Sequence, residues 1–503
     1  MSAVLLDVRP HSRLRGARAV NLNDAVLPVL DAVTASDVDL SRVRVVADWV
    51  QYRDNFRGVV QSRRIGQATP DTGGLPPPEP LGVRDDDLEI AVDLRRSGSV
   101  RPEELHELTA AALSATGDDL PLEDWGPGSR SCVWDFNALY WSALELWEKS
   151  TGRGYEQALP GGESDARNTE AARELILELF GVWDRLVTAQ ALPDELYVLE
   201  IGVGNGGQAK VFLDEFARLD QERGSDYYRR LHYLMCDYSA HVLELARQAV
   251  AEHAEQVSSF TLDATRPCTA LGFLKYKIFL VYVSNVYDNL PTDEVAQLGG
   301  RTYQVEIRAQ LCAADAAELA GSIGIGIDRL PDVVHRLLRL GPSLLADAMP
   351  DRFPDTGAAV DFWRRAWAAV RLDERYVPLA GLDTYDLGGG TDLGGELLRP
   401  LLESGADVRM HVNNGALQSF VDSLRLLHPY GRLVCHDLFV TEIEGYRTHF
   451  RGPGKYDGSV VNWVNGPLLA HVGRRRGFDV RYERFRHRAG GGNIVTMTAQ
   501  ARD

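Results

Sequence analysis

The residues best suited to chemistry in this sequence lie in one glycine-rich stretch, YVLEIGVGNGGQAKVFLDEF (197–216). An apolar run leads into Glu200, and a helical pattern follows the four glycines Gly202, Gly204, Gly206 and Gly207. The first, second and fourth of these glycines fit GxGxxG, a pattern in which a helix N-terminus receives the pyrophosphate of a dinucleotide. Glu200 and the first three glycines fit a second pattern, ExGxGxG. The glycine spacing alone therefore leaves two classes of nucleotide-like ligand open.

Three acidic residues at predicted strand ends favour a cationic ligand. Glu200 stands two residues before the first glycine, where a carboxylate would repel a pyrophosphate and attract a sulfonium or ammonium group. Asp237 ends the second strand, where it can accept hydrogen bonds from both ribose hydroxyls, as it also would for a dinucleotide. Asp263 follows the next strand, at a position suited to the adenine amino group. The acids predict S-adenosylmethionine (SAM) as the ligand, with a dinucleotide or a purely structural loop as alternatives.

The predicted SAM pocket also draws on neighbours of these motifs and on the end of the fourth strand. Its predicted residues are Glu200, Gly202, Gly204, Asn205, Gly206, Asp237, Tyr238, Asp263, Ala264 and Ser284.

This arrangement resembles class I SAM-dependent methyltransferases, and more narrowly the MidA-like group, over roughly 160–291 and 410–500. EIGVGNGG is similar to the first motif of that group, and CDYSAHVLELARQ to its second strand. VSNVYDNLP (283–291) is similar to the group's NEFFDALP signature, matching at Asp288, Leu290 and Pro291. A later turn of that group, with the acidic loop that follows it, is similar to HDLFVTEIEGYRTHFRGPGKYDGSVVNWV. The resemblance implies a class I fold that uses SAM as methyl donor.

One departure from the signature concerns the methyl acceptor. The best-known MidA-like proteins methylate an arginine of a mitochondrial complex I subunit. The Asn-Glu pair of their signature is Ser284-Asn285 here, so the carboxylate that would position a guanidinium is missing. The sequence therefore slightly favours an O or N acceptor on a small molecule over an arginine or another protein side chain.

Acceptor-side residues should project from the ends of the fourth and fifth strands. Methyl transfer is an in-line displacement, so the protein mainly aligns the reactants and removes a proton where the acceptor needs it. Tyr287 and Asp288 are predicted to contact the acceptor or the methionine part, although DNLP could simply cap a helix. In CHDLF, His436 is the predicted general base, and Asp437 could hold a cationic acceptor.

The segment YRTHFRGPGKYDGSVVNW (446–463) is predicted to close over the substrate. Arg167, in the loop 160–170, is predicted to meet the carboxylate of SAM. A rival interpretation of the 446–463 segment is a homodimer contact, to which Trp463 would contribute. The residues expected to meet an anionic group there are Arg447, His449, Arg451, Lys455 and Tyr456.

Alternating strands and helices predict the fold. Strands are expected at 196–201, 231–236, 259–262 and 278–284, with helices at about 207–218 and 239–253 between them. A helix and strand follow over 415–440, and an antiparallel pair closes the chain. The expected fold is an α/β class I, Rossmann-like sheet of seven strands, mostly parallel with an antiparallel C-terminal strand.

Six regions are predicted along the chain. The first resembles the opening of rhodanese-type domains (4–23), but the catalytic cysteine of that family has no counterpart, because the first cysteine is Cys132. The predicted regions are a small α/β N-terminal region (1–65), a Pro/Gly-rich linker (66–83), a helical region (84–190), the first half of the core (191–291), a mainly helical insertion that roofs the substrate (292–405) and the second half of the core (406–503).

The composition of the 503 residues limits the partners. A formal charge of −18 argues against nucleic acid as a main partner, because phosphate binding needs a basic face. The five cysteines have no CxxC spacing, no metal-ligand motif stands out, and no apolar run is long enough for a membrane span. A cytoplasmic SAM-dependent methyltransferase without a metal is therefore expected, with a non-catalytic SAM-binding assembly factor and an NAD(P) oxidoreductase as alternatives.

Overall fold

The chain forms two compact units, each built from segments that alternate along the sequence. Unit 1 consists of Met1–Leu139, Pro291–Val412 and Glu442–Trp463, and unit 2 of Tyr140–Leu290, Asn413–Thr441 and Val464–Asp503. The predicted region 84–190 thus contributes to both units. The computed structural model describes residues 4–9, 11–14, 20–66, 87–114, 119–154, 168–388, 393–403, 407–447, 451–487 and 493–502.

Unit 2 contains a seven-stranded sheet in the order β20-β21-β15-β10-β7-β8-β9. β21 is antiparallel to both of its neighbours, and the other paired strands are parallel. This sheet confirms the predicted fold class, including the antiparallel C-terminal strand. Its strands are β7 (Leu196–Ile201), β8 (Leu231–Asp237), β9 (Val257–Thr261), β10 (Ile278–Ser284), β15 (Leu427–Asp437), β20 (Phe478–Arg484) and β21 (Val495–Ala501).

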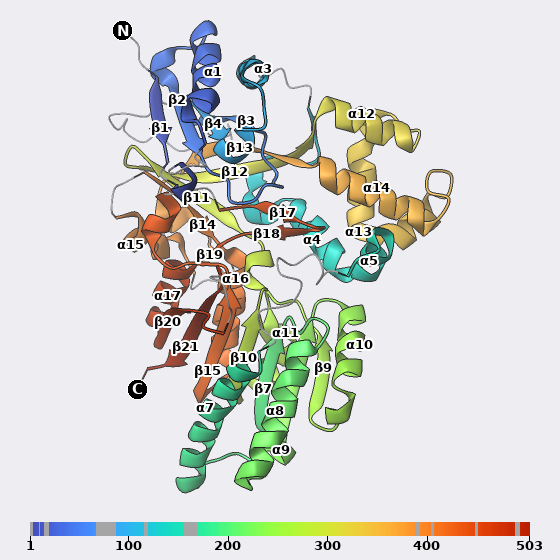
Figure 1. The fold of residues 1–503 in the computed structure, drawn as a ribbon, viewed down its shortest axis with the longest axis vertical. Helices are drawn as coiled ribbons and strands as arrows, with labels where there is room; N and C mark the ends of the chain where they lie inside the picture. The colour runs from blue at the N-terminus through green and yellow to red at the C-terminus, as the bar shows by residue number, and fades with distance from the viewer. Residues whose placement is uncertain are drawn as a thin grey trace. The chain divides into compact units, whose positions relative to one another are not determined.

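Helices cover both faces of this sheet (Figure 1). One core contains side chains of α7 (Thr169–Thr188), α8 (Gly207–Arg223) and α10 (Ala240–Ala249), with Trp183 fully buried at its centre. The other core contains side chains of α11 (Pro267–Leu271), α16 (Asn414–Leu426) and α17 (Gly466–Arg475). Side chains of a strand alternate between these cores, because successive residues point to opposite faces of a sheet.

Local signals explain where two helices of unit 2 begin and end. α7 begins after Asn168, whose side chain accepts hydrogen bonds from the backbone N–H groups of Glu170 and Ala171. α8 continues past the predicted end at 218 to Arg223, and it ends at Gly224, which adopts a left-handed conformation. The other short elements of this unit are α5 (Leu144–Thr151), α9 (Tyr227–Arg230) and the pair β16 (Phe439–Val440) and β19 (Val464–Asn465).

Unit 1 contains a sheet of its own, with the strand order β1-β2-β4-β3-β13-β12-β11-β14 and two short strands, β5 and β6, that pair with β12. The N-terminal strands are therefore separate from the seven-stranded sheet, as expected, and they share their sheet with strands of the insertion, which was not expected. Its strands are β1 (Leu5–Val8), β2 (Val43–Asp48), β3 (Val60–Ile65), β4 (Asp87–Asp93), β5 (Leu120–Pro121), β6 (Gly126–Pro127), β11 (Asp293–Leu298), β12 (Arg301–Leu311), β13 (Arg371–Pro378) and β14 (Val408–Val412).

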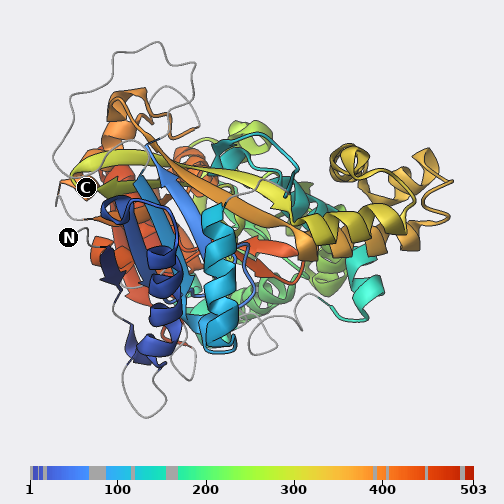
Figure 2. The same cartoon turned by 90° about the horizontal axis from the view of Figure 1, so that it is seen from above.

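Helices α1 (Leu22–Ala35) and α3 (Pro102–Ser114) lie side by side against the N-terminal strands of unit 1 (Figure 2). A helical group, α12 (Ala313–Ser322), α13 (Leu330–Ala348) and α14 (Thr356–Ala369), connects β12 to β13. The remaining elements are α2 (Leu94–Ser97), α4 (Val133–Ser142), α15 (Arg399–Leu402) and the hairpin of β17 (Gly454–Tyr456) and β18 (Ser459–Val461).

Two predicted helical regions contain strands that the sequence analysis missed. The insertion 292–405 supplies β11, β12 and β13 as well as its helices, and the region 84–190 begins with β4. Charged residues inside these strands hid them: Glu294 in β11 and Glu89 in β4 are both buried. The predicted linker 66–83 lies, apart from Gly66, outside the described residues.

Candidate active site

The glycine loop after β7 has a backbone that only glycine accommodates easily at two points. Gly202 has φ 78°, and a Cβ there would lie 2.3 Å from the Cγ2 atom of Val286. Gly206 has φ 80°, and a Cβ there would lie 2.7 Å from the backbone Cα of Ala246 in α10. The two glycines therefore allow the loop to pass close to its neighbours and to deliver the chain to the N-terminus of α8.

Asp237, at the end of β8, fastens this loop. Its Oδ2 accepts a hydrogen bond from the Gly204 N–H at 3.1 Å, and its Oδ1 accepts one from the Ser239 N–H at 3.0 Å. Burial raises the pKa of Asp237 to about 6, although these backbone donors favour its charged form. The predicted ribose acceptor is thus placed directly beside the glycine loop.

Glu200 lies in β7 just before the loop, and its side chain is only 2% exposed. The phenol of Tyr233 in β8 donates a hydrogen bond to Glu200 Oε2 at 2.6 Å. Burial raises the pKa of Glu200 to about 8, and Asp237 adds to this shift while the Tyr233 hydrogen bond opposes it. No cationic side chain of the described residues pairs with this carboxyl group.

The other predicted pocket residues lie around the same sheet edge. Asp263 is exposed beyond β9 and accepts hydrogen bonds from the N–H and hydroxyl of Thr265. Tyr238 is 45% exposed, and Ala264 and Ser284 are half-buried. Asn205 accepts a hydrogen bond from the Gly207 N–H at 3.0 Å, which shapes the loop. The carboxyl ends of parallel strands bring these residues together, and ligands of open α/β sheets bind at that edge.

Asp437 and Asp288 come together, but below the surface. The Asp437 Oδ2 atom accepts hydrogen bonds from the N–H groups of Val286, Tyr287 and Asp288, at 3.2, 2.8 and 3.3 Å, and Asp437 is fully buried. Burial and the neighbouring carboxylate of Asp437 raise the pKa of Asp288. Asp437 therefore holds the loop after β10 in place, a role that differs from the predicted contact with a cationic acceptor.

Tyr287 also lies elsewhere than predicted. It belongs to a 3-10 turn, Tyr287–Asn289, and its side chain is fully buried in the core shared with α16. The turn directs the ring back under the sheet, so in this structure Tyr287 and Asp288 support the loop and do not face an acceptor.

His436 lies near the carboxyl end of β15, beside Ser284 of β10. Its Nδ1 atom is 2.9 Å from the hydroxyl of Thr496, and its ring packs edge-on against Tyr282 and Phe485. Burial, together with the nearby His487, lowers the pKa of His436 to about 4. The imidazole is therefore neutral near pH 7, which is the form that can accept a proton.

Two predicted cations of the 446–463 segment, Lys455 and Arg451, contact other residues of the protein. Lys455 is half-buried, and its ammonium donates hydrogen bonds to the carbonyls of Trp367, Ala368 and Val370 at 2.7, 2.9 and 2.7 Å. Lys455 thus closes the C-terminus of α14, because a cation there satisfies the last carbonyls of the helix. Arg451 lies 4.3 Å from the centre of the Trp463 ring. His449 and Arg167 lie outside the described residues.

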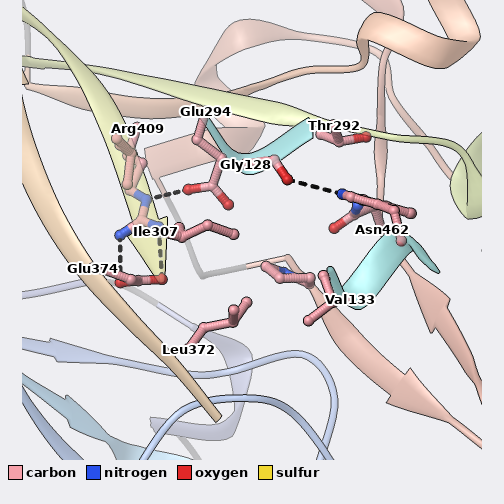
Figure 3. A pocket seen from close by; sticks show the side chains of 12 residues that line it. Gly128, Val133, Thr292, Glu294, Ile307, Leu372, Glu374, Arg409 and Asn462 are labelled. Carbon is pink, nitrogen blue, oxygen red and sulfur yellow. Dashed lines mark hydrogen bonds and ion pairs between the residues drawn. The ribbon is translucent and has the colours of Figure 1, made fainter. Parts of the chain in front are cut away.

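Unit 1 has a small cavity next to a row of buried charges (Figure 3). Glu374 pairs with Arg57, Arg63 and Arg409, and Arg409 also pairs with Glu294 on the cavity wall. The arginines hold the pKa of Glu374 well below its usual range, whereas burial raises that of Glu294. Apolar walls and Asn462, from the 446–463 segment, complete the lining. These charges mainly satisfy one another.

One group of possible metal ligands occurs among the described residues: Asp214, Glu252 and His253. Lys210 pairs with both acids, and the His253 ring is held between Asp214 and the Tyr228 hydroxyl. The group is therefore a surface network that already contains its cation.

Sequence reasoning missed the most important partner in the pocket, Tyr233. The tyrosine in the strand LHYLMC was the available signal, because it lies on the same face as Glu200 and one strand away. Thr496, which contacts His436, comes from the antiparallel β21, and its place could not be read without the strand order.

Comparison with protein-family models and with curated proteins gives no match to this sequence. Among solved structures, the chain is similar to an uncharacterized protein from Burkholderia thailandensis, with 14% identity, a TM-score of 0.41, and coverage of 78% of this chain and 89% of that one. It is also similar to a protein from Burkholderia thailandensis bound to S-adenosyl-homocysteine, with 14% identity, a TM-score of 0.44, and coverage of 78% and 90%.

A third similar structure is the DszA carbon methyltransferase, with 12% identity, a TM-score of 0.32, and coverage of 83% of this chain and 74% of that one. At these identities and TM-scores the similarities do not carry a functional conclusion, so the function is argued from the side chains of the site. Within the described residues, every helix is too short or too polar to cross a bilayer.

Proposed function

We propose that this chain is a SAM-dependent methyltransferase that acts on an O or N atom of a small molecule. The observation that carries the proposal is the buried carboxyl group of Glu200, which has no cationic partner among the described residues and lies directly before the glycine loop. A buried carboxylate without a counter-charge is costly, unless a cation arrives with the ligand. SAM carries two positive groups and no phosphate, so it suits this site better than a dinucleotide does.

The pocket residues fit the rest of such a ligand. Gly202 and Gly206 let the loop turn tightly against Val286 and Ala246, and Asp237 lies beside the loop with oxygens suited to ribose hydroxyls. Asp263 is exposed at the end of the next strand, within reach of an adenine amino group. When bound, SAM would supply a methyl group on a positively charged sulfur.

The acceptor side is argued from the neighbouring strand ends. His436 has a neutral imidazole near Ser284 that can accept a hydrogen bond from the acceptor, while its lowered pKa makes it a weak base. Ser284 and Asn285 leave the end of β10 without a carboxylate for a guanidinium. These features support a small-molecule acceptor over an arginine side chain.

Ligand binding tests the proposal directly. SAM and S-adenosyl-homocysteine (SAH) should each raise the melting temperature of the protein, and NAD and NADP should leave it unchanged. Stabilisation by NAD or NADP alone would overturn the assignment. Incubation of the protein with methyl-labelled SAM and a cell extract, followed by ultrafiltration and chromatographic removal of SAM, should then leave the label in a new small molecule. Label found only in the protein fraction would argue for a protein substrate, and binding without any transfer would argue for a non-catalytic factor.

A further inference from the structure

Glu200 has an unusual environment for a buried acid. Its side chain is 2% exposed, Tyr233 is 1% exposed, and the phenol donates a 2.6 Å hydrogen bond to Oε2. The hydrogen bond can form with either state of the carboxyl group, but it favours the charged one. The pair is thus almost fully buried, and Glu200 can hold or release one proton.

Within the described residues, the elements packed around this pair offer no positive charge. Tyr282 of β10 is the register partner of Glu200 and is also buried, and Asp237 and Cys236 lie at the end of β8. Burial holds the phenol of Tyr282 and the thiol of Cys236 in their neutral forms, because it raises the pKa of both groups. Asp237 adds negative charge. A positive charge on a ligand would therefore be the counter-ion that the site lacks.

Two other buried glutamates of this chain, Glu215 and Glu374, have arginine partners. Glu215, on α8, is 6% exposed and pairs with Arg173 and Arg218 at 2.7 and 2.6 Å. Glu374 in unit 1 pairs with three arginines. Asp437, which is also buried, has backbone N–H donors, three of them on Oδ2, instead of a cation, whereas Glu200 accepts one hydrogen bond, from Tyr233, within the described residues.

We propose that Glu200 and Tyr233 distinguish the sulfonium methyl donor from its thioether product by the exchange of one proton. The inference rests on the proposed function and goes beyond it. Glu200 releases its proton to solvent when a cationic sulfur binds, and Tyr233 then donates its hydrogen bond to the carboxylate. After methyl transfer the sulfur is neutral, so Glu200 takes a proton back from solvent and the neutral pair holds the product less tightly.

This arrangement makes the preference for donor over product depend on pH. The free Glu200 carboxyl group has a pKa of about 8, and a nearby cation lowers it. Below pH 8 the donor must displace the proton, so its affinity rises with pH and levels off above 8. SAH carries the same ribose and ammonium groups, so effects of Asp237 are common to both ligands and cancel in their ratio.

Isothermal titration calorimetry between pH 6 and 9 measures this ratio. We expect the dissociation constant of SAH divided by that of SAM to rise about tenfold or more between pH 6 and 8.5. Sinefungin, which has a protonated amine in place of the sulfonium, should follow SAM. At pH 7, titrations in buffers of different ionisation enthalpy should show more protons released with SAM than with SAH.

Three variants assign the effect to these residues. Glu200→Gln should bind both ligands with a ratio that does not change with pH. Tyr233→Phe removes the donor that favours the carboxylate, so the rise in the ratio should move to higher pH. Glu215→Gln removes another buried acid, which has its own arginines, and its ratio should follow that of the parent protein.

The outcomes separate this inference from the proposed function. Absence of binding by SAM, SAH and sinefungin to the folded parent protein would refute the function itself. Binding of SAM and SAH with a constant ratio from pH 6 to 9, and equal proton release, would refute the proton exchange alone. The parent protein's titrations decide this even where a variant fails to fold.

Discussion

At the scale of single residues, Glu200 is expected to lower the stability of the ligand-free protein. The folded state holds its carboxyl group with a pKa of about 8, whereas the unfolded chain has the ordinary value of 4.5. Because the folded pKa is raised, the unfolded state releases its proton first as the pH rises. The free energy of unfolding therefore falls between pH 4.5 and 8 and stays level above 8, as far as this group contributes.

Glu200→Gln should thus stabilise the ligand-free protein while it harms ligand discrimination. We expect the variant and its parent to unfold at similar urea concentrations at pH 5, and the variant to be more stable at pH 8.5 by on the order of 3 kcal/mol. Urea denaturation at the two pH values measures this. Glu215→Gln, tested beside it, should lose stability at both pH values, because it loses its ion pairs with Arg173 and Arg218. A Glu200→Gln variant that is less stable than the parent at pH 8.5 would contradict the argument.

The sequence predicted the local geometry of the glycine loop better than the contacts between residues far apart in the chain. Gly202, Gly206 and Asp237 have the positions that their motif implies, since the geometry is local to one strand, one turn and the next strand. Tyr287 and Asp437 could not be placed in the same way. Their burial depends on a contact between the loop after β10 and the end of β15, which lie about 150 residues apart in the chain.

At the scale of elements, α8 carries a matched pair of glycines at its two ends. Both are left-handed, with φ 80° at Gly206 and 66° at Gly224. A Cβ at Gly206 would meet the backbone of Ala246, whereas a Cβ at Gly224 would have no atom within 4 Å. The two positions therefore separate backbone strain from steric clash.

Alanine substitutions at these glycines should differ in both stability and ligand binding. Gly224→Ala should cost about 1 kcal/mol from strain alone and leave the SAM affinity unchanged. Gly206→Ala should cost about 3 kcal/mol or more and weaken SAM at least tenfold, because α10 or the loop must move. Urea denaturation and calorimetric titration of both variants provide the test. Equal effects of the two substitutions would show that the close approach to α10 is unimportant.

A second element-scale prediction concerns Lys455 and α14. Lys455→Met keeps the aliphatic length and removes the three donors to the last carbonyls of the helix. The unsatisfied carbonyls should cost about 2–4 kcal/mol. Lys149→Met, at an exposed position in the last turn of α5, is the control and should change stability by less than about 0.5 kcal/mol. Faster hydrogen exchange at the end of α14 should accompany the loss, and unchanged exchange there would contradict the capping role.

Strand prediction succeeded where burial was apolar and failed where burial was ionic. β7 and β10 are mainly apolar runs with the predicted bounds 196–201 and 278–284. β11 reads DEVAQL, and all six of its residues are buried. Glu294 can lie inside because Arg409 pairs with it from β14, more than 100 residues away. A single sequence does not show that partner, so a buried strand looked like the polar face of a helix.

At the scale of the whole molecule, the chain passes repeatedly between two units that each have their own sheet and core. The predicted ligand residues all belong to unit 2, while the insertion, the 446–463 segment and the buried charge row belong to unit 1. The sequence could show the alternation of strands and helices in unit 2. It could not show that the N-terminal strands and the insertion share one sheet, because β3 and β13 pair across some 300 residues.

The ligand-free protein should unfold in two calorimetric transitions, because each unit buries its own apolar surface in its own core. SAH at 100 times its dissociation constant should stabilise unit 2 by about 2.7 kcal/mol and leave the other transition in place. Hydrogen exchange identifies the units, since peptides from β7 and β8 should gain protection with SAH and peptides from β2 and β12 should not. A single transition that moves as a whole with SAH would mean that the crossings of the chain bind both units into one cooperative block.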